Sequence, residues 1–282
     1  MFRTTLTLVA FTMTSTAALA DGHAGTTGYA LVENGTALLT MADIAAPTAT
    51  KAMLDTPLRA IAWRPVTGTL LGYADNAMYA IDPATGATTD LGASFMDDAA
   101  IGADAAVALD FNNAIDAVRA VSSAGDNLVY FPDGFGGGDE KQNSVRRFTG
   151  LAYADGDAMA GSTPMVFANA YTNAINGEAA PSTFQYALDA ETDALISLAN
   201  NAGTLETIAK VTVDGAGVDL APMGGFDIYS PMVGSDQAYA ILQMEGADSA
   251  GLYAIDLETG AASILADLGM GGVTGSAVTA GN

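Results

Sequence analysis

Short runs in which apolar side chains alternate with polar or small ones recur along the chain, separated by turns rich in Gly, Asp, Asn and Thr. This period of two is typical of half-buried β-strands. Runs that end in a polar turn begin at similar intervals, at residues 61–65, 109–113, 169–173 and 226–230. A second strand is predicted after each of them, at 69–74, 117–122, 183–188 and 237–242. The period of 48 to 60 residues suits a four-stranded blade of a β-propeller.

A repeated nonapeptide supports this interpretation. It occupies residues 79–87 and 253–261, and a third close copy occupies 186–194. Each copy begins with a short run of alternating apolar residues that ends in Asp. Thr and then Gly or Asp follow within four residues, and residues of these types favour tight turns. We interpret the three copies as hairpins of a repeat architecture.

These elements predict an all-β fold, a β-propeller. A blade of about 52 residues gives about five blades, and the shorter blades of about 45 residues found in other propellers give six as the alternative. The first strands, at 28–32 and 36–41, have no leading strand before them, and the last strand, at 273–278, has none after it. We therefore expect pairing of the N- and C-terminal strands to close the ring and remove a sheet edge.

The first twenty residues have the features of a secretory signal peptide. Arg3 supplies a positive start, residues 6–13 are apolar, and Ala18-Leu19-Ala20 form a small-x-small cleavage site before Asp21. Residues 21–282 are then expected to form a single propeller domain, exported to the periplasm or outside the cell. No later stretch contains about eighteen uninterrupted apolar residues, so we predict no membrane span.

Composition excludes several classes of function. The 282 residues include no Cys and one His, His23, which excludes thiol chemistry, Cys-type zinc sites and histidine-dependent triads. Nine Lys and Arg stand against 32 Asp and Glu, which gives a formal net charge of −23. We expect no nucleic-acid partner, because such binding needs clustered positive charge. Self-repulsion between acidic surfaces favours a monomer.

A set of short motifs extends over nearly the whole of the expected mature chain. It comprises residues 63–68, 79–86, 110–112 with Asp116 and Arg119, 124–128, 151–158, 170–173 and 225–227. In these motifs the chain resembles the bacterial exported proteins grouped as domain of unknown function 4394. The resemblance implies an exported β-propeller-like domain without an assigned activity. Residues 134–140 depart from the usual pattern of that family.

Two carboxylates are the candidate catalytic groups. Asp110 and Asp227 occupy the same position in the repeated leading strands, which line the central channel of a propeller. A glycosidase needs such a pair, one as acid and one as base or nucleophile. Alternatively both bond local backbone amides or pair with Arg64 or Arg119, because buried acids are generally satisfied by their neighbours. In that case they serve folding and not chemistry.

A cation site is the second chemical option. Asp155 and Asp157, with Asn169 and Asn173 nearby in sequence, offer hard oxygen ligands suited to calcium. We predict no cofactor apart from this calcium. The remaining candidates for the channel or the surface are Trp63, Arg64, Asn112, Arg119, Tyr171 and Tyr229. Trp63 and Tyr171 also suit aromatic packing between blades.

Three hypotheses about function follow. The first is an exported acidic propeller that acts as a binding or scaffold module without catalysis, for a protein or carbohydrate partner. The second is a carboxylate- or calcium-dependent hydrolase that acts on a glycoside or lactone. The third is a structural protein of the cell surface or matrix. The repeat pattern is strong and the catalytic pattern is weak, which favours the first hypothesis.

Export is tested by the N-terminus of the mature protein. With a label after Asn282, expression in a bacterium should yield a chain that begins at Asp21, because the small-x-small site precedes it. N-terminal sequencing of the purified protein measures this. A chain that retains Met1 and stays in the cytoplasm would contradict the prediction.

Overall fold

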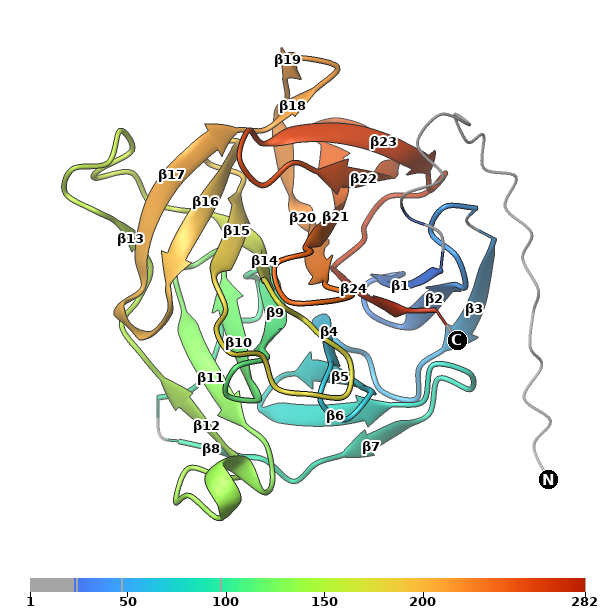
Figure 1. Ribbon diagram of the computed structural model, residues 1–282, viewed down its shortest axis with the longest axis vertical. Coiled ribbons are helices and arrows are strands. Elements are labelled where there is room, and N and C mark those ends of the chain that lie inside the picture. Colours follow the sequence, from blue (N-terminus) through green and yellow to red (C-terminus); the bar gives the residue numbers. More distant parts are fainter. Residues whose placement is uncertain (1–22, 24, 47, 97, 282) are drawn as a thin grey trace.

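Five sheets surround a central axis in the computed structural model, which describes residues 23, 25–46, 48–96 and 98–281. Figure 1 looks along this axis and shows the ring of blades. Consecutive strands within a blade are antiparallel, and the inner strands of neighbouring blades contact one another around the axis. The prediction of an all-β propeller with five blades is confirmed, and the six-blade alternative is wrong.

Each of the first three blades is built from the axis outward. Blade 1 contains β24 (Gly275–Ala280), β1 (Thr26–Val32), β2 (Ala37–Met41) and β3 (Ala49–Met53). Blade 2 contains β4 (Ala60–Arg64), β5 (Thr69–Ala74), β6 (Ala77–Ile81) and β7 (Thr88–Asp90). Blade 3 contains β9 (Val107–Asn112), β10 (Ala117–Ser122), β11 (Asn127–Phe131), β12 (Ser144–Arg147) and β8 (Ser94–Phe95).

The last two blades carry short additional strands at their outer edges. Blade 4 contains β14 (Val166–Tyr171), β15 (Gln185–Asp189), β16 (Ala194–Ala199), β17 (Thr204–Lys210) and β13 (Ala152–Tyr153). Blade 5 contains β20 (Leu220–Tyr229), β21 (Gln237–Met244), β22 (Ala250–Ile255), β23 (Ala261–Asp267), β18 (Thr212–Val213) and β19 (Ala216–Gly217). Two short 3-10 helices are η2 (Phe135–Gly137) and η3 (Asn200–Ala202).

The chain ends close the ring as expected. β24 is the innermost strand of blade 1 and pairs with β1 in antiparallel register, with Ala277 opposite Tyr29. The last strand of the chain therefore completes the first blade. This pairing removes two edges that would otherwise be exposed to another chain.

A backbone hydrogen bond recurs at four of the five junctions between blades. In each, the acceptor is the carbonyl of a residue with positive φ, at the end of the turn between the third and fourth strands of a blade. The donor is a backbone amide in the segment that leaves the preceding blade. The donor and acceptor pairs are Asp55 and Gly86, Ser94 and Asn143, Ala152 and Gly203, and Thr212 and Gly260. After three of these bonds a short parallel strand pair forms, β8 with β12, β13 with β17 and β18 with β23.

The repeated nonapeptide does not mark equivalent positions throughout. Residues 79–87 and 253–261 join the third and fourth strands of their blades, but 186–194 join the second and third strands of blade 4. The hairpin predicted at 186–194 is confirmed, and it lies one strand earlier in its blade than the other two copies. The motif encodes a local turn, in which Asp189 accepts the Glu191 amide at 3.1 Å, and such a turn can form at either end of a blade.

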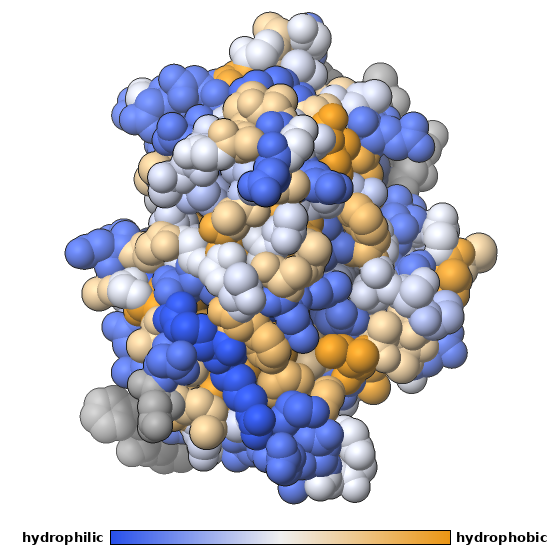
Figure 2. Space-filling model, turned by 90° about the vertical axis from the view of Figure 1, so that its left-hand side faces the viewer, coloured by the Kyte–Doolittle hydropathy of each residue, from blue (hydrophilic) through white to orange (hydrophobic). Residues whose placement is uncertain are grey.

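Apolar side chains on both faces of the blades form the core. One cluster joins blades 2 and 3 through Tyr73 and Phe111, and another joins blades 4 and 5 through Leu188 and Phe226. Figure 2 shows one flank of the ring, where hydrophilic residues surround small separate apolar areas. Among the described residues no helix is long and apolar enough to cross a membrane.

The junction glycines are tested by comparing two substitutions in blade 2. Both Gly86 and Gly92 have positive φ, which costs roughly 1–2 kcal/mol for an L-residue. A Cβ at Gly86 would also lie 2.0 Å from the Met53 carbonyl oxygen, whereas a Cβ at Gly92 meets nothing within 4 Å. We expect Gly86→Ala to lower the free energy of unfolding more than Gly92→Ala in a urea titration. Equal losses would contradict the junction contact.

Candidate functional site

The two candidate carboxylates lie deep within the ring. Asp110 is on β9 and Asp227 is on β20, and their exposed fractions are only 3% and 4%. β9 and β20 are the innermost strands of their blades, and both contact β14, the inner strand between them. The expectation that the repeated inner strands place these side chains near a common axis therefore agrees with the geometry.

Asp110 joins the inner strands of blades 3 and 4. Its Oδ2 accepts a hydrogen bond of 2.5 Å from the backbone amide of Tyr171 on β14. A side chain on β9 thereby accepts an amide of β14, the inner strand of the next blade.

Asp227 makes the same connection between blades 5 and 1. Its Oδ2 accepts the Val278 amide on β24 at 2.6 Å, and its Oδ1 accepts the Ile228 amide at 2.7 Å. The inner strand of a blade pairs on one side only, so amides that face the axis need another acceptor when water is excluded. The two carboxylates are these acceptors, Asp110 between blades 3 and 4 and Asp227 between blades 5 and 1.

Burial sets the protonation of this pair. It raises the pKa of Asp227 to about 7, against the lowering effect of the Val278 and Ile228 amides. Burial raises the pKa of Asp110 as well, and the nearby charge of Asp227 raises it further. Two carboxylates that share a low-dielectric site are not both readily ionised. The pair therefore retains a proton into the neutral range of pH.

The channel between the inner strands is almost filled. A cavity of about 10 Å³ lies on the axis, lined by residues of all five inner strands, among them Ile61, Leu109, Asn169, Phe226 and Ser276. This volume is about that of one water position. The buried amide group of Asn169 has no hydrogen-bond partner among the described residues. A sugar ring or lactone cannot enter a space of this size.

A wider pocket of about 200 Å³ lies where the inner strands begin. Apolar side chains dominate its lining, including Leu58, Phe167 and Met223, and none of the lining residues is acidic. Arg59 lines it as well, but its guanidinium is occupied by Asp75 and the carbonyl of Gly102, both at 2.6 Å. This mouth therefore offers no carboxylate for acid or base catalysis.

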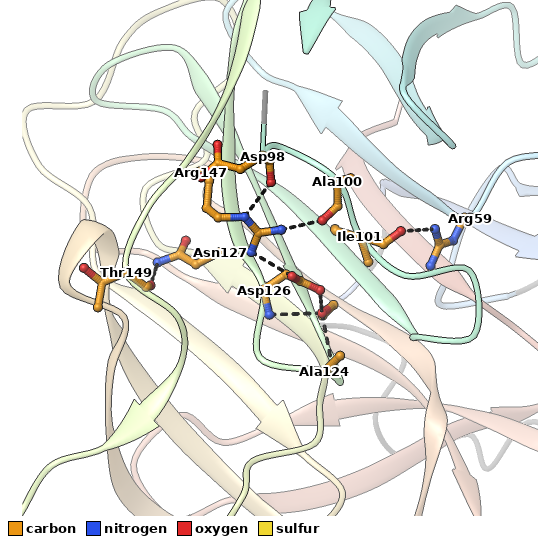
Figure 3. Close-up of polar contacts among 10 residues, drawn as sticks. Arg59, Asp98, Ala100, Ile101, Ala124, Asp126, Asn127, Arg147 and Thr149 are labelled. Carbon is orange, nitrogen blue, oxygen red and sulfur yellow. Dashed lines mark hydrogen bonds and ion pairs between the residues drawn. The ribbon is translucent and has the colours of Figure 1, made fainter. Parts of the chain in front are cut away.

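Two arginines hold the segment that forms one wall of this pocket. Arg147 donates to the carbonyls of Asp98 and Ala100, and Arg59 donates to Ile101, Gly102 and Ala105, as Figure 3 shows in part. Arg147 also pairs with Asp126 at 2.8 Å. These contacts join Arg147 to residues that lie far from it in the sequence.

The opposite end of the channel is covered by residues 172–184, between β14 and β15. Figure 1 shows this segment crossing the centre of the ring in yellow. Its Gly177 amide donates to the Pro65 carbonyl of blade 2 at 2.9 Å, and its Ala180 amide donates to the Asn113 carbonyl of blade 3 at 3.1 Å. The buried Asn113 side chain donates in turn to the Asn173 carbonyl at 2.9 Å. Asn113 was not among the predicted residues.

The calcium candidates are not brought together. Asp157 accepts the Thr207 amide at 2.6 Å and the Thr207 hydroxyl at 2.8 Å, which fixes it to β17 at the outside of blade 4. Asp155 is exposed beside it. Asn173 instead donates to the Ser182 carbonyl and accepts the Gly234 amide at the covered end of the channel. These side chains do not fit a shared cation site, and within the described part of the chain no three acidic or His residues cluster as metal ligands.

Four of the other candidates make contacts between blades. Arg64 forms a bidentate pair with Asp116, and Arg119 donates to the Tyr171 hydroxyl at 2.9 Å. Trp63 stacks on Tyr29 at 6.0 Å between ring centroids. The two arginines considered as partners for Asp110 and Asp227 thus bond elsewhere.

The last two candidates take different positions. Asn112 accepts the Thr183 hydroxyl at 3.0 Å and so helps to hold the covering segment. Tyr229 is half-buried and packs against the core cluster of blades 5 and 1.

Four apolar residues in the turns after the inner strands were not among the predicted site residues. We call the end of the propeller formed by residues 113–116, 172–184 and 230–236 the loop face. Its exposed apolar side chains are Ile115, Phe184, Met232 and Val233. Apolar side chains inside otherwise polar turns were the available signal, because a solvated turn has no need of them.

The buried pair predicts a dependence of stability on pH. Because the pKa of Asp227 is raised by folding, the folded state binds more protons than the unfolded state between about pH 4 and 7. Stability should therefore fall as pH rises through this range, by up to about 1.4 kcal/mol per pH unit for one proton.

Urea titrations at several pH values measure this slope. Asp227→Asn should make the slope shallower, with burial of Asp110 as the remaining contribution. Asp155→Asn, which changes an exposed carboxylate, should leave the slope as in the wild type. A wild-type slope in Asp227→Asn would contradict the assignment.

Comparisons with known proteins place the chain in a family. No curated protein matches it. The solved structures that resemble it include a protein of unknown function from Bacteroides thetaiotaomicron, with 12% identity and a TM-score of 0.45, over 79% of this chain and 53% of that one. A candidate 6-phosphogluconolactonase from Bacteroides uniformis gives 18% identity and a TM-score of 0.42, over 88% and 84% of the two chains.

Hydrazine synthase of Kuenenia stuttgartiensis gives 13% identity and a TM-score of 0.36, over 78% of this chain and 51% of that one. The chain thus spans about half the length of this enzyme and of the Bacteroides thetaiotaomicron protein. The family model described as "Domain of unknown function (DUF4394)" matches residues 38–277. The chain belongs to this family.

Proposed function

We propose that the protein is an exported binding or scaffold propeller and that it does not catalyse hydrolysis. The observation that carries the proposal is the use of both candidate carboxylates as acceptors for backbone amides. Asp227 engages one amide with each oxygen, and Asp110 bonds the Tyr171 amide on the next blade. These contacts give each carboxylate a structural task.

Access to the pair supports the same function. The channel beside it has room for about one water, and residues 172–184 cover one end. General acid catalysis needs the acid within hydrogen-bond reach of the substrate. A glycoside has no path to Asp110 or Asp227 in this arrangement.

Hydrolysis is the second candidate function, and one observation favours it. Raised pKa values of two interacting carboxylates are a feature of catalytic acids. Structural burial produces the same shift, so the two functions must be separated by activity and stability measured on the same variants.

The separating experiment uses Asp110→Ala and Asp227→Ala with the wild type. We expect the wild type to release no product from aryl glycosides or from a lactone. At pH 5 each variant should lose about 1–3 kcal/mol of unfolding free energy, because the Tyr171 amide loses its acceptor in Asp110→Ala and the Val278 and Ile228 amides lose theirs in Asp227→Ala. Asp155→Ala is the control and should unfold like the wild type. Measurable hydrolysis that both variants abolish, with unchanged stability, would replace the binding function by catalysis.

A further inference from the structure

Exposed apolar side chains concentrate at one end of the propeller. Seven large apolar residues are exposed among those that the structure describes, and four of them lie on the loop face. Ile115 is 51% exposed, Phe184 49%, Met232 65% and Val233 56%. They come from the turns after the inner strands of blades 3, 4 and 5, which are consecutive in the ring. Apolar side chains gathered in this way mark interaction sites on soluble proteins.

Hydrogen bonds hold these three turns in one arrangement. The Gly234 amide donates to Asn173 Oδ1 at 2.7 Å, and the Asn173 amide donates to Asp236 Oδ1 at 2.8 Å. These bonds join residues 230–236 to 172–184. The Thr183 hydroxyl, which donates to Asn112, joins 172–184 to the turn that carries Ile115. A fixed surface loses little conformational freedom when a partner binds.

Acidic side chains lie at the same end of the propeller as these apolar residues. In a blade of antiparallel strands, the turns after the first and third strands lie at the same end. The turns after the third strands contain the exposed Asp82, Asp133 and Glu258, and the covering segment contains the exposed Glu178. Hydrogen bonds from Thr85 and Ala84 lower the pKa of Asp82, so it remains ionised near neutral pH. An apolar centre with a charged rim is the usual anatomy of a binding interface.

Three of the arginines form ion pairs with aspartates of the same chain. Arg64 is paired with Asp116, Arg59 with Asp75 and Arg147 with Asp126. Lys141, which shares a turn with Asp133, is paired with Asp139 at 3.1 Å. Acidic residues also outnumber basic ones in the sequence, 32 to nine. A second copy of the same chain would bring two acidic rims together, which is unfavourable.

We propose that the loop face binds a cationic protein segment that presents apolar side chains between Lys and Arg residues. The apolar side chains of the partner pack on Phe184, Met232 and their neighbours, and its basic side chains face the acidic rim. This inference rests on the proposed binding function and adds the surface and the chemistry of the partner.

A synthetic peptide of alternating Leu and Lys pairs is the probe, and titration calorimetry with the full chain measures its dissociation constant. The double variant Phe184→Ser with Met232→Ser should weaken binding at least about tenfold, because it removes two of the four exposed apolar side chains of the loop face. The control is Met53→Ser with Met96→Ser, two exposed methionines outside the loop face, and it should bind like the wild type. Added salt should weaken binding by screening the rim.

Four results would overturn the proposal. In calorimetry, these are absence of binding by the wild type, equal weakening in the control variant, and equal affinity for a peptide with Glu in place of Lys. In sedimentation, the fourth result is a wild-type dimer that Phe184→Ser disrupts. The last result would assign the surface to a second copy of the chain. None of these outcomes depends on hydrolysis, so the failure of this proposal is distinct from failure of the binding function. Thermal unfolding of each variant confirms that the fold is retained.

Discussion

Backbone amides that face the axis of a closed ring need acceptors, and this need controls the centre of the molecule. Each inner strand pairs on one side only, and the space on its other side is too narrow for bulk water. Asp110 and Asp227 extend their carboxylates to the next inner strand and accept the amides of Tyr171 and Val278. Burial of the acids raises their pKa values, which is the cost of using charged groups as acceptors there.

In this arrangement, a raised carboxylate pKa occurs without access for a substrate, although the two often occur together in active sites. A buried carboxylate with a raised pKa suggests catalysis, but catalysis also requires a path for the substrate and a free oxygen at the reacting atom. Here Asp227 has an amide on each oxygen, and residues 172–184 lie across one end of the channel. The same covering segment contributes Phe184 to the loop face. Closing the channel and building an outer surface are thus done by one part of the chain.

The sequence predicted local structure well. The strands expected at 69–74 and 117–122 match β5 and β10 in both bounds, because alternation and turn residues are local signals. Ring closure was also predictable, since unpaired strands at the two ends leave few other ways to complete a blade. The hairpin predicted at 186–194 is confirmed as well, although it joins the second and third strands of its blade and the other two copies join the third and fourth, because turn chemistry does not specify which strand precedes it.

The site was predicted only in part. The shared register of Asp110 and Asp227 showed that both lie at the axis, but their acceptor role depends on Tyr171 and Val278, which are distant in sequence and bond through backbone atoms. No side-chain pattern marks an amide that faces the channel. Asp157 illustrates the same limit. Its spacing near Asp155 suggests calcium, whereas its actual partner, Thr207, lies on β17, about 50 residues later in the chain.

Amide hydrogen exchange of Tyr171 and Val278 tests the central claim most directly. In the wild type both amides should exchange slowly, because each is buried and donates to a carboxylate. Asp110→Ala should accelerate exchange at Tyr171 more than at Val278, and Asp227→Ala should do the reverse. Equal acceleration at both amides in each variant, or none in either, would contradict the account.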